Sequence, residues 1–176
     1  MNNDILELLK DSGAFMEGHF LLTSGRHSDK YIEKFRLMES PKHLDKICNL
    51  MAKQFIEDDV DIVLGAAIGG ILLSSGVAKY LNKKSIFTER VETNMELRRG
   101  FEIKNNHRVL IVEDIVTTGG SIVELIEVVK QNNGEVAGIT SIVDRSTQEV
   151  GFGSNYKPLL RYPVESWNED DIPSWL

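Results

Sequence analysis

The strongest constraint on the fold of this chain comes from residues 109–121, which read VLIVEDIVTTGGS. The first four residues are aliphatic, as is typical of a strand that is buried on both faces. Residues 122–130 then repeat apolar side chains with helical periodicity. Between these two parts lie two adjacent carboxylates and a loop of small and hydroxyl-bearing residues. The segment therefore predicts a strand, a polar loop and a helix that begins where the loop ends.

The loop at this helix N-terminus has residues that suit a phosphate group. Gly119 and Gly120 allow backbone amides to turn toward a ligand. Thr117, Thr118 and Ser121 add hydroxyl donors, and the helix dipole favours an anion at the same place. Because no lysine follows the glycines, the loop lacks the pattern of nucleoside triphosphate hydrolases.

The acid pair Glu113 and Asp114 indicates more than a phosphate loop. Two carboxylates beside a phosphate would repel it unless they face hydroxyl groups or a divalent cation. A ribose that carries a phosphate satisfies both halves of the segment. The simpler alternative is an ordinary strand-to-helix turn, in which a threonine or serine caps the helix and the two acids are solvated.

The remaining chain alternates between strand and helix patterns. Strands are expected at residues 62–64, 86–87, 109–112 and 136–143, and helices at residues 41–57, 71–81 and 122–131. This alternation predicts an α/β fold with a doubly wound, mostly parallel sheet. A short amphipathic N-terminal helix and a hairpin are expected to form a small hood over the C-terminal edge of that sheet.

We expect one domain, made of a hood at residues 1–40, a core at 41–150 and a tail at 151–176. With 176 residues, 41% of them hydrophobic, the chain can bury one core and has no room for a second large domain. The tail contains Trp167 and Trp175 and packs either on the domain or at a dimer contact.

Composition excludes several functional classes. The net charge of -7 argues against bulk affinity for nucleic acid, and the absence of a membrane-spanning run or a secretory signal predicts a cytoplasmic protein without a membrane partner. The single cysteine, Cys48, excludes an internal disulfide and falls on an apolar helical stripe, which predicts a core residue. The four histidines show no ligand spacing, so we expect no zinc site.

Residues 109–121 closely resemble the phosphoribosyl pyrophosphate (PRPP) binding motif of the type I phosphoribosyltransferases. Residues 61–71, DIVLGAAIGGI, match the loop with which this family holds pyrophosphate through backbone amides. The resemblance implies that the acid pair binds the ribose hydroxyls and that residues 115–121 hold the 5-phosphate. The PRPP-binding residues that it implies are Ala67, Ile68, Arg90, Glu113, Asp114, Ile115, Val116, Thr117, Thr118, Gly119, Gly120 and Ser121. Asp114 and Arg90 would be the catalytic residues.

Two further segments resemble the orotate phosphoribosyltransferases within this family. Residues 18–32, GHFLLTSGRHSDKYI, resemble the segment that opens their base-binding side. Residues 139–146 predict a strand that ends in Asp144 and Arg145, at the same edge of the sheet as the acid pair. A guanidinium matches both oxygens of a planar carboxylate. The resemblance therefore implies orotate binding by Ser24, Tyr31, Thr117 and Arg145.

Each of these segments also has a purely structural interpretation. The first would be an ordinary surface hairpin, and Arg145 would pair with Asp144 or with another acid at the strand end. Thr23 also stands where the orotate enzymes often have a lysine.

Residues 87–101 form a polar stretch that is too irregular to be expected in the core, and they predict a mobile flap. In the family such a flap closes over the site, and in dimers it reaches into the neighbouring subunit. Orotate enzymes often carry several lysines and a histidine there. Here the only cations are Arg90, Arg98 and Arg99. Because arginine is an effective clamp for pyrophosphate, we expect these residues to do the same work.

The resemblance implies a transferase that converts orotate and PRPP into orotidine 5'-phosphate and pyrophosphate in the synthesis of UMP. Magnesium would be the cofactor, held mainly through PRPP without a dedicated protein site. The protein would be a homodimer with a shared flap. Two alternatives stay open: a type I transferase that acts on a purine, and a PRPP-sensing regulatory protein that keeps the cradle without the catalytic flap.

Overall fold

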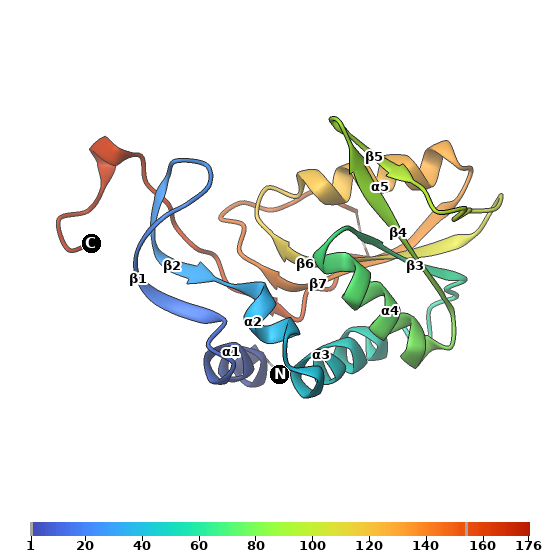
Figure 1. Cartoon of the computed structure of the whole chain (residues 1–176), viewed down its shortest axis with the longest axis horizontal. Helices are drawn as coiled ribbons and strands as arrows, with labels where there is room; N and C mark the ends of the chain where they lie inside the picture. The colour runs from blue at the N-terminus through green and yellow to red at the C-terminus, as the bar shows by residue number, and fades with distance from the viewer. Residues whose placement is uncertain (1, 154) are drawn as a thin grey trace.

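The computed structural model describes residues 2–153 and 155–176. Its centre is a six-stranded sheet in the order β5-β4-β3-β6-β7-β8 (Figure 1). The strands are β3 (Ile62–Ala66), β4 (Lys84–Val91), β5 (Asn94–Leu97), β6 (Arg108–Val116), β7 (Glu135–Asp144) and β8 (Leu160–Arg161). Neighbouring strands run parallel except β4 and β5, which are antiparallel. The predicted α/β fold with a mostly parallel sheet is confirmed.

Helices cover both faces of this sheet, with α3 (Pro41–Lys53) and α4 (Gly69–Leu81) on one face and α5 (Gly120–Gln131) on the other (Figure 1). The side chains of β6 alternate between the two layers: Leu110 packs with the first pair of helices and Ile111 with α5. Because helices cover both faces of the sheet, β6 is apolar at all four residues 109–112. No helix in the described part of the chain is long and apolar enough to cross a membrane.

The first core helix, α3, begins as predicted, with the Ser40 side chain accepting a hydrogen bond from the amide of His43. It ends at Lys53, so the predicted end at residue 57 is wrong. Residues beyond the helix form tight turns, in which the amide of Phe55 donates to the carbonyl of Ala52. Phe55 is nevertheless fully buried, because the turns keep its ring on the apolar side of α3.

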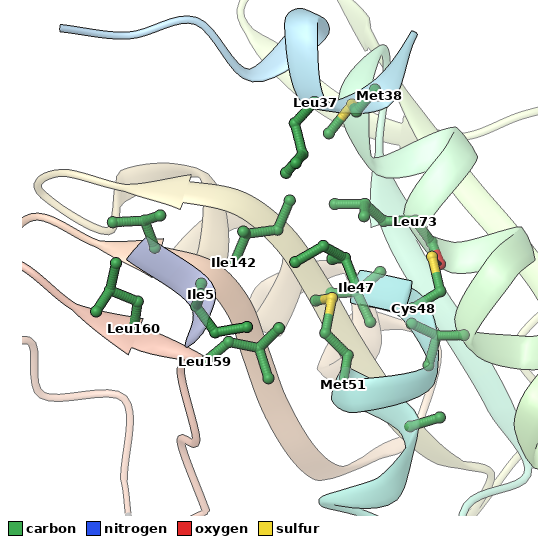
Figure 2. Close-up of a cluster of buried hydrophobic side chains, with 14 of the residues drawn as sticks. Ile5, Leu37, Met38, Ile47, Cys48, Met51, Leu73, Ile142, Leu159 and Leu160 are labelled. Carbon is green, nitrogen blue, oxygen red and sulfur yellow. Dashed lines mark hydrogen bonds between the residues drawn. The ribbon is translucent and has the colours of Figure 1, made fainter. Parts of the chain in front are cut away.

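The hood contains α1 (Asn2–Asp11), the antiparallel hairpin of β1 (Phe15–Leu21) and β2 (His27–Ile32), and the short helix α2 (Lys34–Met38). Figure 2 shows how the hood joins the core: Ile5 of α1 and Leu37 of α2 lie in the same apolar cluster as Ile47 of α3. Hydrophobic burial therefore fixes the base of the hood on the α3 side of the sheet.

Cys48 lies within the same cluster and is fully buried (Figure 2). Burial raises the pKa of its thiol to about 12, which leaves no thiolate at neutral pH. The prediction that Cys48 is a core residue is confirmed.

The predicted irregular structure of residues 87–101 is wrong for most of that stretch. β4 continues through Val91, turns at Glu92 and Thr93, and pairs with β5 so that Thr88 lies opposite Leu97. An edge hairpin needs only one covered face, so its polar residues can face outward. The many charged side chains hid this alternation from the sequence pattern.

The tail packs on the domain, which was one of the two alternatives for residues 151–176. β8 adds a sixth strand beside β7, with Leu160 opposite Val143. Leu159, Leu160 and Val164 are buried, and a short 3-10 helix follows at Glu169–Asp171. A two-residue strand is too short to leave a recognisable pattern, and therefore it was not predicted.

Gly65 of β3 packs closely against the start of α4, and a substitution there measures how much this close packing contributes to stability. A Cβ atom on Gly65 would lie 2.2 Å from the carbonyl oxygen of Gly70, and both atoms belong to the backbone. We expect Gly65→Ala to lower the free energy of unfolding by about 1–3 kcal/mol, because the helix must shift away. Urea unfolding curves measure the change.

The control for Gly65 is Gly151→Ala, because a Cβ atom there would meet no heavy atom within 4 Å. This variant should differ from the wild type by less than about 0.5 kcal/mol. Equal unfolding midpoints for the two variants would show that the close approach does not limit stability.

Candidate active site

A cleft of about 1050 Å³ lies between the hood and the C-terminal ends of β6 and β7. It brings together every residue that the family resemblance implied for the base: Ser24 and Tyr31 from the hood, Thr117 after β6 and Arg145 after β7. Asp114 lines the same cleft. The strand ends and the hood therefore face one space, as expected for the C-terminal edge of a parallel sheet.

A second hollow of about 280 Å³ follows the loop after β6. It is lined by Glu113, Ile115, Val116, Thr117, Thr118, Gly119, Gly120, Ser121, Ile122 and Glu124. Gly119 precedes α5 with a φ of 81°, and a Cβ atom there would lie 2.3 Å from the ring of Phe152. Glycine is thus required on both conformational and steric grounds.

The N-terminus of α5 has no side-chain cap, because its N-cap residue is Gly119 and no side chain accepts a hydrogen bond there. The alternative in which a threonine or serine caps the helix is therefore wrong. The first amides of an α-helix have no partner within the helix, so an uncapped N-terminus that borders a hollow can receive an anion.

Glu113 and Asp114 are buried at the end of β6, with 7% and 4% of their surface exposed. The amide of Asp114 donates to Glu113 Oε1 over 2.9 Å, and the amide of Ile115 donates to Asp114 Oδ1 over 2.7 Å. Lys34 Nζ lies 2.6 Å from Asp114 Oδ2. The two acids are thus held by backbone amides and by one cation from the hood.

Burial raises the pKa of Glu113 to about 7, and the neighbouring charge of Asp114 adds to this shift. The amide of Asp114 and the charge of Lys34 act in the opposite direction. Glu113 can therefore change its charge near neutral pH.

The loop after β3 reaches the acid pair from the other side. The amide of Ala67 donates to the carbonyl of Thr88 over 2.8 Å, and the peptide bond between Ala67 and Ile68 is cis. A Cβ atom on Gly69 would lie 2.1 Å from Asp114 Oδ2. Only glycine therefore allows this loop to lie against the carboxylate. The loops after β3 and β6 therefore meet, as expected for loops at the same edge of the sheet.

Arg145 is half-buried in the large cleft, and burial lowers the pKa of its guanidinium. Its predicted alternative partner, Asp144, instead accepts hydrogen bonds from the amide and the hydroxyl of Ser146. Within residues 2–153 and 155–176 no acid forms an ion pair with Arg145. The interpretation in which Arg145 only closes an ion pair is therefore wrong.

The three arginines of residues 87–101 all face acids. Arg90 Nη2 lies 2.7 Å from Glu124 Oε2, and Glu124 lines the smaller hollow. Arg99 lies 2.9 Å and Arg98 4.0 Å from the carboxylate of Glu89. Arg90 thus lies beside the start of α5 and the smaller hollow, whereas Arg98 and Arg99 are held along the hairpin.

Sequence reasoning missed Lys34 and Arg26, which both line the large cleft. Lys34 lies outside residues 18–32 and outside the other segments that resemble the family, and its contact with Asp114 joins segments far apart in the chain. Arg26 lies within residues 18–32, and its positive charge is the one signal that could have marked it as a site residue.

The domain family described as "Phosphoribosyl transferase domain" matches residues 37–151. The orotate phosphoribosyltransferase of Caldicellulosiruptor saccharolyticus is 44% identical over 168 residues, which are 96% of this chain and 88% of the relative. The crystal structure of the orotate phosphoribosyltransferase from Aeropyrum pernix is similar with a TM-score of 0.75 and 27% identity, over 89% of this chain and 93% of that chain.

The fold is also shared with a solved adenine phosphoribosyltransferase, that of Thermoanaerobacter pseudethanolicus. Its TM-score is 0.73 over 89% of this chain and 99% of that chain, but the identity is only 18%. This similarity concerns the fold alone. Together with the match of residues 37–151, the extent and identity of the first relative show that the chain belongs to the phosphoribosyltransferase family, in the group of the orotate phosphoribosyltransferases.

Proposed function

We propose that the protein transfers the 5-phosphoribosyl group of PRPP to orotate, which yields orotidine 5'-phosphate and pyrophosphate in the synthesis of UMP. One observation carries the proposal: a single cleft contains Asp114 of the acid pair, the start of the phosphate loop and the guanidinium of Arg145. The names of the relatives, which are orotate phosphoribosyltransferases, support the same reaction.

On the PRPP side, the loop of residues 115–121 is proposed to hold the 5-phosphate at the uncapped N-terminus of α5. Glu113 and Asp114 would accept hydrogen bonds from the ribose hydroxyls. The backbone of Ala67 and Ile68 lies beside Gly69 and Asp114, where it would meet the pyrophosphate. Arg90 would clamp the pyrophosphate after leaving Glu124.

On the base side, Arg145 is proposed to bind the carboxylate of orotate, with Ser24, Tyr31 and Thr117 around the ring. N1 of orotate loses its proton to solvent and forms the new bond to C1 of the ribose. The bond from C1 to the pyrophosphate oxygen breaks, and its electron pair leaves with pyrophosphate. Orotate can react as an anion, so positioning and stabilisation of the leaving group dominate the rate. Closure of the hairpin β4–β5 over the site would exclude water from the cationic centre.

We propose that magnesium would be held mainly by PRPP. In the part of the chain described, no three histidine, cysteine, aspartate or glutamate side chains gather into a metal site. Asp114 already faces Lys34, and Mg²⁺ commonly keeps waters and phosphate oxygens as ligands. When bound, the metal would neutralise charge on the leaving pyrophosphate.

Two alternative functions differ from this proposal. A purine transferase would act on a different base, and a PRPP-sensing regulator would bind PRPP without turnover. A purine has no carboxylate, so Arg145 without an acidic partner in the described chain favours orotate. A PRPP-sensing regulator is favoured by one observation only, the engagement of Arg90, Arg98 and Arg99 with acids. Those ion pairs are largely exposed and are worth little energy, so they can exchange for a ligand.

We also propose a homodimer in the cytoplasm. Ile68 and Leu72, one helical turn apart at the start of α4, are exposed apolar side chains that a second copy would cover. Their place beside the pyrophosphate loop would bring a partner's hairpin close to the site.

The reaction is tested by the fall in orotate ultraviolet absorbance when the protein is mixed with PRPP and magnesium. Adenine, guanine and xanthine serve as parallel substrates. Orotate consumption that stops without PRPP is the expected result. Turnover of a purine instead would replace the base assignment, and PRPP binding without turnover of any base would favour the regulator.

Asp114→Asn should weaken PRPP binding about 10- to 100-fold, since hydrogen bonds to a charged acceptor contribute about 1.5–3 kcal/mol. Calorimetric titration with PRPP measures this change. The control is Asp170→Asn, which alters an exposed acid outside the cleft. Unchanged PRPP affinity in the Asp114 variant would contradict the proposed role of the acid pair.

Arg145→Met should raise the KM for orotate by about 10- to 100-fold while the KM for PRPP stays within about twofold. The reason is that methionine retains the apolar stem but removes the donors for the carboxylate. Steady-state kinetics with each substrate varied in turn provides both values. Equal effects on both substrates would place Arg145 outside the base site.

Glu113→Gln should change how stability depends on pH. Because the pKa of Glu113 rises from 4.5 to about 7 on folding, the native state binds its proton more tightly than the unfolded state. The stabilisation that comes from this tighter proton binding is fully present below pH 4.5 and is lost as the pH rises through about 7. Glutamine stays neutral, so the melting temperature of the variant relative to the wild type should rise between pH 5 and pH 8.

Glu149→Gln is the control for the pH series, because Glu149 is exposed. Its melting temperature relative to the wild type should stay level over the same range. A level difference for Glu113→Gln as well would mean that Glu113 has an ordinary pKa in the folded protein.

A further inference from the structure

The C-terminal tail runs along the second strand of the hood hairpin (Figure 1). The amide of His27 donates to the carbonyl of Trp167, and the amide of Trp167 donates to the carbonyl of His27, each over 2.8 Å. Next to this pair, the fully buried hydroxyl of Ser28 donates to the carbonyl of Glu165 over 2.8 Å. The tail thus forms an additional strand-like edge on the hood.

Arg26 strengthens this contact with three donors of its guanidinium. Nε donates to Ser166 Oγ over 2.8 Å, and Nη1 donates to Asn168 Oδ1 over 2.9 Å. Nη2 donates to the carbonyl of Ser166. A planar guanidinium with several fixed partners holds two segments in one orientation, which a flexible ammonium does less well.

The other end of the tail is attached to the core beside Arg145. The amide of Tyr162 donates to the carbonyl of Asp144 over 2.8 Å, and the amide of Val164 donates to the carbonyl of Arg145 over 3.2 Å. Residues 164–167 line the large cleft between these two attachments. The tail therefore spans the cleft from the end of β7, where Arg145 follows, to the hairpin that carries Tyr31.

We propose that Arg26 is a positioning residue, which fastens the hood to the C-terminal tail and thereby sets the separation of Ser24 and Tyr31 from Arg145. The inference rests on the proposed function, because it assigns these residues to the orotate side. Three of the five N–H donors of the Arg26 guanidinium already bind the tail. Arg26 therefore affects the site by holding the hood in place and not by contacting the substrate. The acid pair is held by backbone amides and by Lys34 of α2, and α2 is anchored in the core cluster through Leu37 and not by the tail. The KM for PRPP should therefore depend little on the contact of Arg26 with the tail.

The test compares Arg26→Met with the double variant Ser166→Ala and Asn168→Ala, which removes two of the acceptors and leaves Arg26 intact. Both should raise the KM for orotate, Arg26→Met by about tenfold, with the KM for PRPP within about twofold. Combining all three substitutions should add little to Arg26→Met, because the same contact is already broken. Arg36→Met, at an exposed position of α2, is the matched control and should leave both constants unchanged.

Two outcomes would overturn the proposal. If Arg26→Met alone raised the KM for orotate and the double variant did not, Arg26 would contact the substrate directly. If both lowered only the melting temperature and left each KM unchanged, the contact would contribute to stability alone.

Hydrogen exchange of the ligand-free protein separates this proposal from the proposed function. The amide of His27, which donates to Trp167, should exchange faster in Arg26→Met and in the double variant than in Arg36→Met. Unchanged exchange would exclude an anchoring role. If the wild-type protein consumed no orotate, the proposed function would fail, while exchange would still decide whether Arg26 fixes the hood.

Discussion

The burial of two adjacent carboxylates at the end of β6 is the constraint on which the site depends. Buried acids are costly unless backbone donors or a cation compensate them. Here the amides of Asp114 and Ile115 and the ammonium group of Lys34 supply that compensation. Because Lys34 belongs to the hood, the charge balance of the core is complete only when the hood is in place.

Glycines allow the loops beside the acid pair to come close to it and to turn sharply. Gly69 lets the loop after β3 lie against Asp114, and Gly119 lets the loop after β6 turn into α5 without a side-chain cap. Two loops and one helix terminus therefore converge on a small space. The proposed chemistry needs such convergence, because ribose hydroxyls, a phosphate and a pyrophosphate must be bound at once.

The base side has a different physical basis. Its walls come from three segments that are far apart in the chain: the hairpin with Tyr31, the end of β7 with Arg145, and residues 164–167 of the tail. The tail connects the other two through backbone hydrogen bonds and through Arg26. Selectivity for the base would thus depend on packing between segments, whereas binding of PRPP, as proposed, would depend mainly on local loop conformation.

Much of the fold and of the site was predictable because the signals are local. The apolar run of β6, the acid pair and the glycines are consecutive, and the parallel sheet places consecutive strand ends at one edge. The hairpin at residues 87–97 was not predicted, because charged side chains obscured its alternation. Strand β8 is too short to show any pattern.

The sequence by itself determined the α/β class, the glycine-containing loop at the start of α5 and the position of the acid pair at the end of β6, since each depends on neighbours in the chain. Only the tertiary structure decided that Lys34 faces Asp114, that Arg145 lacks an acidic partner within the described residues, and that the tail joins the hood to β7. These contacts depend on charge pairing and backbone hydrogen bonds between distant segments. Their partners are chosen by the path of the folded chain, which no local pattern records.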